Sequence, residues 1–302
     1  MSINVTARSI GESQTPGMKL SAVIPCRNAA DRLPRQLEAL TREKWQGGWE
    51  VVIADNGSTD GTREVAEGFR DRLPHLLVVD ASARRGASYA RNVGARLASG
   101  DAFLFLDADD EIAPGYLPAM ADALGHHDFV AAHRDSKSLN TCWVRLSRRS
   151  HEYEGFRNFF GFLPHAGGNR MGVRRSIFES VGGFDENLLG DEDVDFCWRV
   201  QLAGIPLRLV PNATLRYRYR ESLRGIFRQA RLSGSSDALL YRRYREAGMP
   251  GRSMGVGLSE WLRLMRRLPR IRTKSDWARW VRRLGQCVGR LEGSLRYRVV
   301  YL

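Results

Sequence analysis

The chain has 302 residues, a hydrophobic fraction of 43% and a formal net charge of +13. This length allows one large core, or a core with a smaller appendage. No apolar stretch approaches the roughly 20 residues that cross a bilayer, and we expect no secretory leader before the first strand. The 4 cysteines show neither paired metal-ligand spacing nor a disulfide framework, which favours a reducing, cytoplasmic location. The polar residues 1–16 are predicted to form a disordered tail.

Strands and helices alternate along the first hundred residues. Residues 20–25 and 50–54 are apolar, and both segments run into polar, turn-forming residues. A helical stretch then leads to a third strand at residues 76–79, and another helix is predicted over residues 86–97. This alternation predicts an α/β fold, with a parallel sheet and helices on both of its faces.

The next predicted strand, residues 102–106, ends in the acidic sequence Asp107-Ala108-Asp109. Carboxylates do not stay buried unpaired, so they must emerge at the carboxyl edge of the sheet, where ligands bind in open α/β folds. Residues i and i+2 of an extended segment point the same way, so Asp107 and Asp109 can meet one divalent cation or one nucleotide. A solvated acidic turn before the next helix is the alternative. Polar residues at the ends of several strands favour the ligand site.

Polar motifs recur further along the chain, at residues 23–28, 54–62, 90–94, 105–110, 167–169, 174–178, 182–186 and 192–199. Together and in this order they resemble the family 2 glycosyltransferases, over roughly residues 20–219. The resemblance implies a GT-A-type Rossmann-like sheet with flanking helices. It also implies a hexosyltransferase-like enzyme that moves a sugar from a nucleotide-diphosphate sugar to a glycan, lipid-linked or small-molecule hydroxyl acceptor, with inversion at the anomeric carbon. Cell wall or polysaccharide biosynthesis is the expected setting.

The donor would bind at the strand ends. Asp55 can accept a hydrogen bond from a nucleobase N–H, or it can simply cap the following helix. Asp107 can accept from ribose hydroxyls or join a metal shell, and Asp109 is the predicted direct ligand, because Mg²⁺ and Mn²⁺ prefer carboxylate oxygens. The predicted nucleotide-sugar contacts are therefore Pro25, Arg27, Asp55, Arg91 and Asp107. For each of the two arginines, a surface ion pair is the alternative.

Five carboxylates crowd the start of the helix predicted after Gly190, namely Asp185, Asp191, Glu192, Asp193 and Asp195. The helix dipole is one explanation for them. Their mutual repulsion also raises some of their pKa values, which suits a general base. The resemblance implies Asp193 as that base, with Glu192 and Asn169 touching the acceptor. Asp195 and Arg199, one turn apart, are predicted to form an ion pair.

One position departs from the family's pattern. Many relatives carry a histidine where this chain has Arg216, within the strand predicted at residues 213–217. An arginine is always protonated and cannot bind a metal, but it can neutralise a diphosphate through a bidentate contact. Arg216 is therefore predicted to contact the diphosphate, and the need for the divalent cation is left open.

Positive charge gathers in the C-terminal third. Residues 205–302 hold 23 Arg and Lys against 6 Asp and Glu, which leaves 24 against 28 for the rest. Amphipathic, basic patterns surround Trp261 and Trp280, and such helices suit an anionic membrane surface. Nucleic acid is a less favoured partner, and a solvated basic face on helices that pack against the catalytic domain is the third alternative. We expect a catalytic domain at residues 17–220 and a basic helical extension at residues 221–302.

Two other classes of protein remain as alternatives. A sugar nucleotidyltransferase also uses a strand-end acidic pair with a metal, but it usually shows a Gly-rich phosphate loop with Arg and Lys near the first strand, which this sequence lacks. A non-catalytic module that binds nucleotide sugars or glycans is the other. The presence of Asp107, Asp109 and Asp193 argues against it, because a degenerate site would tend to lose one of them.

Overall fold

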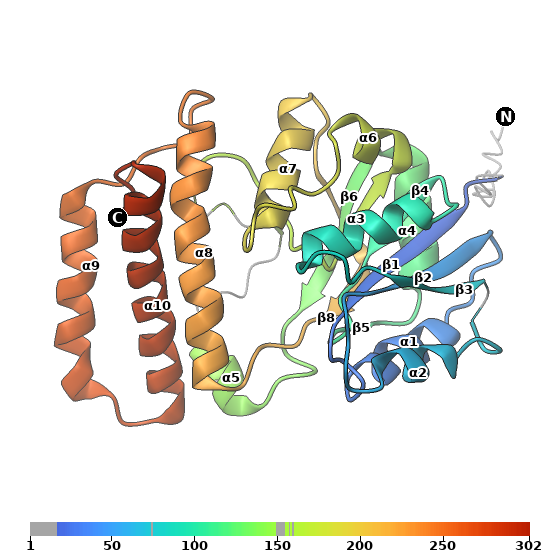
Figure 1. The fold of residues 1–302 in the computed structure, drawn as a ribbon, viewed down its shortest axis with the longest axis horizontal. Helices are drawn as coiled ribbons and strands as arrows, with labels where there is room; N and C mark the ends of the chain where they lie inside the picture. The colour runs from blue at the N-terminus through green and yellow to red at the C-terminus, as the bar shows by residue number, and fades with distance from the viewer. Residues whose placement is uncertain (1–16, 74, 149–154, 157, 159) are drawn as a thin grey trace, which may run out of the picture.

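The computed structural model describes residues 17–73, 75–148, 155–156, 158 and 160–302. The predicted disordered tail, residues 1–16, lies outside them. The described chain forms an α/β structure in which helices cover both faces of a sheet, and a layer of long helices stands beside it (Figure 1). The predicted fold class is confirmed.

The sheet of the described residues has the order β3-β2-β1-β4-β7-β6-β8-β5. Its strands are β1 (Leu20–Cys26), β2 (Trp49–Asp55), β3 (Leu76–Asp80), β4 (Ala102–Phe105), β5 (Glu111–Ile112), β6 (Phe129–Asp135), β7 (Met171–Arg174) and β8 (Arg208–Arg216). β1 to β4 are parallel, as predicted. The later strands make the sheet mixed, because β7 runs antiparallel to both of its neighbours, β4 and β6, and β5 runs antiparallel to β8.

Each face of the sheet has its own hydrophobic core. The helices are α1 (Leu33–Thr41), α2 (Thr62–Glu67), α3 (Ala87–Leu97), α4 (Tyr116–His126), α5 (Cys142–Ser147), α6 (Arg175–Ser180), α7 (Glu192–Leu202), α8 (Leu223–Tyr244), α9 (Met254–Arg267) and α10 (Lys274–Tyr297), with a 3-10 turn at Leu268–Arg270. Side chains of α1 and α4 fill one core, and those of α3, α6, α7 and α8 fill the other.

The helix α3 lies close against the sheet because it carries Gly94. A Cβ at this position would lie 2.6 Å from the Cγ1 atom of Val23 and 3.5 Å from the Cβ of Ala54. This close approach holds Arg91, one turn earlier on α3, beside the carboxyl ends of β1 and β4.

The three C-terminal helices stand side by side, with α10 between α8 and α9 (Figure 1). Glycines let the backbones of α8 and α10 touch: a Cβ on Gly289 would lie 2.0 Å from the carbonyl oxygen of Arg231. On its other side, α8 joins the core of the sheet, where Tyr244 meets Trp198 of α7 edge to face at 5.2 Å between ring centroids. None of the described helices has the length and apolarity that a membrane span requires. The predicted boundary at residue 221 stays a prediction.

Candidate active site

Three carboxylates meet where the chain leaves β4. One oxygen from each of Asp107, Asp109 and Asp110 lies within 4.8 Å of the others. Burial and then the charge of Asp107 raise the pKa of Asp109, against the opposing charges of Arg32 and Arg220. The same two causes raise the pKa of Asp110 far above its ordinary value. The predicted acidic cluster is present, and Asp110 is a member that the sequence analysis did not name, although it is the next acid of the same motif.

Asp110 is held from two sides and is only 1% exposed. Its carboxylate accepts a hydrogen bond from the backbone N–H of Arg218 at 2.8 Å, and a second from the side-chain amide of Asn169. Asn169 is itself buried, so in this structure its amide supports the acidic cluster. The predicted contact between Asn169 and the acceptor stays a prediction.

The cluster fits a hard divalent cation. Its donors are carboxylate oxygens, which Mg²⁺ and Mn²⁺ prefer, and they belong to neighbouring residues on one turn. Arg32 approaches Asp109 at 3.6 Å, and Arg91 pairs with Asp107 at 2.7 Å. Even with the charge of Arg220, burial and the repulsion among the three acids raise the pKa values of Asp109 and Asp110. A bound cation would relieve that repulsion.

Arg91 joins the acidic cluster to the helix α7. One guanidinium nitrogen donates to Asp107 at 2.7 Å and another to Glu192 at 2.9 Å. Burial acts to lower the pKa of Arg91, but the charges of both carboxylates outweigh it and the pKa is raised. Arg91 thus forms an ion pair, as the alternative to a donor contact expected, but it does so as a buried residue and not on the surface. Its predicted contact with the donor stays a prediction.

Asp193 lies in the first turn of α7, half-buried. One carboxylate oxygen accepts from the backbone N–H of Gly168 at 3.1 Å, and the other from that of Val194 at 2.9 Å. Burial and the charge of Glu192 raise the pKa of Asp193 to about 6. Asp191, which precedes the helix with a left-handed φ of 53°, also has a raised pKa, through burial and then Asp237. The predicted upward shift within this group of carboxylates is confirmed.

The ends of β1 and β2 bring the other predicted donor contacts to the same edge. Asp55 is buried and accepts from the backbone N–H of Ser58 at 3.1 Å, a turn contact of the kind expected of a cap. Burial and then the charges of Asp55 and Asp107 raise the pKa of Cys26, which shows that these strand ends converge. Pro25 is half-buried at the end of β1 and Arg27 is exposed. Their contacts with a donor stay predictions.

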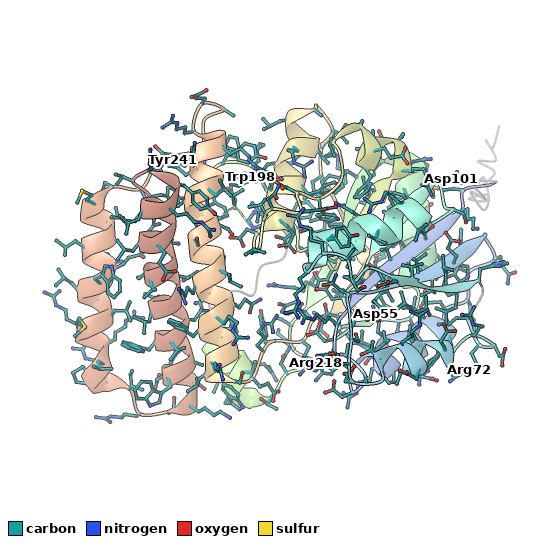
Figure 2. The ribbon with its side chains drawn as sticks, in the orientation of Figure 1. Asp55, Arg72, Asp101, Trp198, Arg218 and Tyr241 are labelled. Carbon is teal, nitrogen blue, oxygen red and sulfur yellow. The ribbon has the colours of Figure 1, made fainter. Side chains whose placement is uncertain are left out.

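Arg216 forms an ion pair with Glu111 at 2.5 Å, its partner across the β5–β8 ladder. The next arginine, Arg218, donates from its Nε atom to the carbonyl oxygen of Asp109 at 3.1 Å, where the chain passes from β8 toward α8 (Figure 2). Arg220 is exposed, and its charge acts on Asp109. Arg218 and Arg220 were not predicted as site residues from the sequence. The pattern that could have indicated them is the alternation of Arg and Tyr over residues 216–220.

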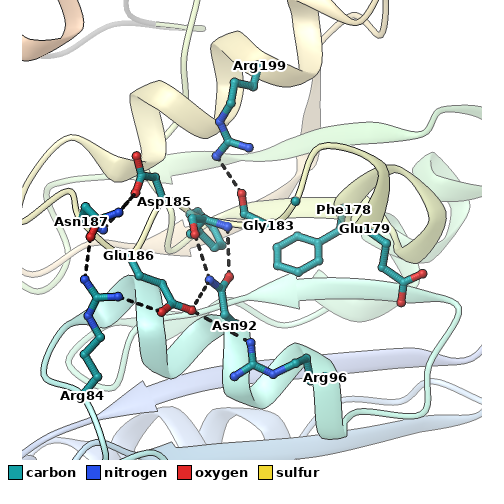
Figure 3. Close-up of a pocket in the computed structure, with 12 residues that line it drawn as sticks. Arg84, Asn92, Arg96, Phe178, Glu179, Gly183, Asp185, Glu186, Asn187 and Arg199 are labelled. Atoms are coloured by element: carbon teal, nitrogen blue, oxygen red, sulfur yellow. Dashed lines mark hydrogen bonds and ion pairs between the residues drawn. The ribbon is translucent and has the colours of Figure 1, made fainter. Parts of the chain in front are cut away.

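A hollow of about 580 Å³ lies against α3, and its lining does not include the acidic cluster (Figure 3). Its polar side chains mostly satisfy one another: Glu186 accepts from Asn92 at 2.9 Å and from Arg84 at 3.3 Å. Arg199 donates to the carbonyl oxygen of Gly183 at 2.7 Å. These contacts stabilise the loop between α6 and α7, which leads to Asp193.

Solved structures with this fold include glycosyltransferases. Mannosyltransferase PcManGT from Pyrobaculum calidifontis, in complex with GDP-Man and Mn²⁺, matches with a TM-score of 0.62 at 18% identity, over 92% of this chain and 88% of that one. Residues 1–349 of TarS from S. aureus, in complex with UDP, match with a TM-score of 0.53 at 19% identity, over 94% of this chain and 93% of that one. This likeness shows the fold and confirms the predicted GT-A type.

Sequence relatives agree with the fold. Succinoglycan biosynthesis protein ExoA of Rhizobium meliloti is 28% identical over 239 residues, which are 76% of this chain and 71% of that protein. Uncharacterized glycosyltransferase YfnE of Bacillus subtilis is 34% identical over 142 residues, 46% of this chain, and the match spans only 33% of that relative's length. A family model described as glycosyl transferase family 2 matches residues 21–182. The chain belongs to glycosyl transferase family 2.

Proposed function

We propose that this protein transfers a sugar from a nucleotide-diphosphate sugar to a hydroxyl group of a glycan, a lipid-linked molecule or a small molecule, with inversion at the anomeric carbon. The observation that carries the proposal is the buried Arg91, which links the acidic cluster at Asp107 to Glu192, next to Asp193. A site for the donor's diphosphate and a candidate base are thereby held at a fixed separation, with the reacting carbon between them.

Asp193 acts as the general base. Its carboxylate takes the proton from the acceptor hydroxyl while the hydroxyl oxygen forms a bond to the anomeric carbon, and the bond from that carbon to the diphosphate breaks on the opposite face. The electron pair of the broken bond leaves with the nucleoside diphosphate. The N–H groups of Gly168 and Val194 hold the two carboxylate oxygens in place. A pKa of about 6 leaves Asp193 ionised at neutral pH and more basic than an ordinary aspartate.

The donor's diphosphate lies over the acidic cluster. Asp109 and Asp107, together with Asp110, would hold a divalent cation, Mg²⁺ or Mn²⁺, which when bound would neutralise the charge of the departing diphosphate. Arg218 and Arg220 lie beside Asp109 and add positive charge. Arg216 contributes only if its ion pair with Glu111 opens. Pro25, Arg27 and Asp55 contact the nucleotide and Asp107 its ribose, whereas Glu192 and Asn169 face the acceptor.

The biological setting is the synthesis of a cell wall component or another polysaccharide, with peripheral binding to a membrane. The name of ExoA refers to succinoglycan biosynthesis, and this relative supports a polymer or lipid-linked acceptor. The solved neighbours are complexes with UDP, UDP-GlcNAc and GDP-Man, so uridine and guanosine donors come first in any test.

The test is a screen of UDP- and GDP-sugars for release of the nucleoside diphosphate, with Mn²⁺ and with a chelator. We expect release from one donor, and we expect Mn²⁺ to tighten donor binding in calorimetry. The Asp109→Ala variant should lose the effect of Mn²⁺, whereas Asp122→Ala, which changes an exposed aspartate of α4, should keep it. If wild-type binding does not depend on the metal, then Arg218→Ala should weaken donor binding more than Asp109→Ala does.

Release of pyrophosphate from a nucleoside triphosphate and a sugar phosphate would instead identify a nucleotidyltransferase. Donor binding without any turnover would identify a binding module.

A further inference from the structure

The outermost helix of the helix layer is α9 (Figure 1). It exposes a stripe of large apolar side chains. Met254, Leu258, Leu262 and Met265 are between 48% and 68% exposed. They recur at positions i, i+4, i+8 and i+11, so they lie along one face of the helix. Only Gly257 and Leu264 of α9 are buried, which means that α10 covers a different face. The exposed stripe is therefore not the seam that holds α9 to the protein.

The neighbouring helix adds exposed apolar surface. Trp277, Leu291 and Leu295 of α10 are 43%, 44% and 73% exposed, at positions i, i+14 and i+18 of a single face. The side of α10 that carries Gly289 is buried against α8, and Trp280 donates from its indole N–H to the carbonyl oxygen of Leu264 in α9 at 3.0 Å. Together, α9 and α10 present more apolar surface than the packing of the helix layer uses.

Arginines occupy the exposed side of α9 beyond the stripe: Arg266 lies next to it, Arg263 and Arg267 lie further round the helix, and Arg270 is in the 3-10 turn that follows. Arg263, Arg266, Arg267 and Arg270 are exposed, and none of them pairs with an acidic side chain of the described residues. The acid of this helix, Glu260, is already paired with Arg252 at 2.6 Å and with Arg290 at 3.0 Å. Burial and then the charges of Arg267 and Arg263 lower the pKa of Arg283, with Glu260 opposing them. The positive charge around α9 is thus poorly balanced from within the protein.

We propose that α9 lies in the plane of an anionic lipid bilayer, with its apolar stripe at the boundary between headgroups and acyl chains and its arginines at the level of the phosphates. A second copy of the chain would bring the same arginines together, which like charges oppose. Duplex nucleic acid would match the arginines but would leave the apolar stripe without a partner. A membrane matches both features. The surface lies beyond α8 and α10 from α7, the helix that carries Asp193 (Figure 1). The inference rests on the membrane binding proposed above, for which it names the surface, and not on the proposed sugar transfer.

The test is co-sedimentation of the full chain with lipid vesicles. We expect binding to vesicles of equal parts phosphatidylglycerol and phosphatidylcholine, and none to phosphatidylcholine alone. Raising the salt from about 0.1 M to about 0.5 M should weaken binding through screening. The double variant Leu258→Ser, Met265→Ser removes apolar contacts, and Arg263→Gln, Arg267→Gln removes charge. Each should bind at least about tenfold more weakly.

Two matched controls alter similar side chains elsewhere. Leu97 of α3 is 55% exposed, and the Arg42 side chain after α1 is 68% exposed; Leu97→Ser and Arg42→Gln should bind the anionic vesicles as the wild type does. Thermal melting checks that every variant folds, and Leu258→Ser alone replaces the double variant if that one does not. The proposal is overturned if the wild type ignores anionic vesicles, if the α9 variants bind as well as the controls, or if duplex DNA competes the protein off the vesicles at physiological salt.

Discussion

Arg91 keeps two groups of carboxylates from repelling one another across the site. Its guanidinium contacts Asp107 on one side and Glu192 on the other, and it is only 4% exposed. A buried arginine with two partners is a rigid spacer, because without those partners its own guanidinium would be a buried, uncompensated charge. Asp193 lies next to Glu192 and is held by backbone N–H groups, so its position follows from the same contact.

The raised pKa of Asp193 predicts an acid limb in the pH–rate profile. The base works only when it is ionised, and the ionised fraction falls as the pH drops below the pKa of about 6. We therefore expect kcat/KM to fall about tenfold for each pH unit below that value and to stay level above it. Initial rates from about pH 4 to pH 8 would show this. A profile that stays level down to about pH 4, where an ordinary aspartate titrates, would contradict the assigned shift.

The candidate site was predictable from sequence where a residue follows directly from a strand or a motif. Asp107 and Asp109 end an apolar strand, and Asp193 lies in a run of acids at a helix start, so local pattern was enough. The roles of Arg218 and Asn169 were not predictable, because both meet Asp110 from distant parts of the chain, 108 and 59 residues away. Likewise, the pairing of Arg216 with Glu111 was not predictable, because it depends on the β5–β8 ladder. Arg216 was predicted to contact the diphosphate instead.

At the scale of elements, α8 holds α7 in place. Asp195 of α7 is fully buried and pairs with Arg199 on its own helix at 2.8 Å, as its i, i+4 spacing predicts. Its other oxygen accepts from Arg243 at 2.5 Å and from the hydroxyl of Tyr244 at 2.8 Å, both at the end of α8. Arg243 also reaches Asp185, at 2.8 Å. Thus the helix that carries the proposed base depends on a helix assigned to the C-terminal extension.

Removing Arg243 should loosen this contact. Arg243→Ala leaves the buried Asp195 with fewer partners, and we expect a loss of about 2 kcal/mol in the free energy of unfolding, together with a fall in kcat. Denaturant unfolding and initial rates measure the two effects. Arg245→Ala is the matched control, because Arg245 only approaches the exposed Glu246 at 3.9 Å, and it should change stability by less than about 0.5 kcal/mol. Equal effects of the two variants would argue that α8 does not position α7.

At the scale of the whole molecule, the sheet and the helix layer form one packed body. The alternation of strands and helices in the first hundred residues could be predicted from the sequence, because each element has its own hydrophobic period. The antiparallel direction of β7 could not be predicted, since its place between β4 and β6 depends on contacts across the sheet. The basic C-terminal third was predicted as helices on charge and amphipathic pattern. The close packing of α10 against α8 through glycines was not predicted from the sequence.

The contact between α8 and α10 predicts a large effect of a small substitution. A Cβ on Gly289 would lie 2.0 Å from a backbone oxygen of α8, so Gly289→Ala must push the helices apart. We expect a loss of about 2 kcal/mol or more in the free energy of unfolding, despite alanine's better helix propensity. Gly255→Ala in α9 is the control, because its Cβ would meet only Ser253, at 3.8 Å. Denaturant unfolding that shows equal stability for both variants would mean that the helices do not touch there.

The central claim is that Asp193 is the base of a sugar transfer, and the most direct measurement compares Asp193→Asn with the wild type on the donor that the screen identifies. The asparagine keeps the size of the side chain and one of its two hydrogen-bond-accepting oxygens, but it cannot accept the proton. We predict that calorimetry finds donor binding within about twofold of the wild type, whereas the rate of sugar transfer falls by about 10²-fold or more. Glu192→Gln, the neighbouring substitution, should reduce the rate less. A near-normal rate for Asp193→Asn, or a greater loss for Glu192→Gln, would contradict the account.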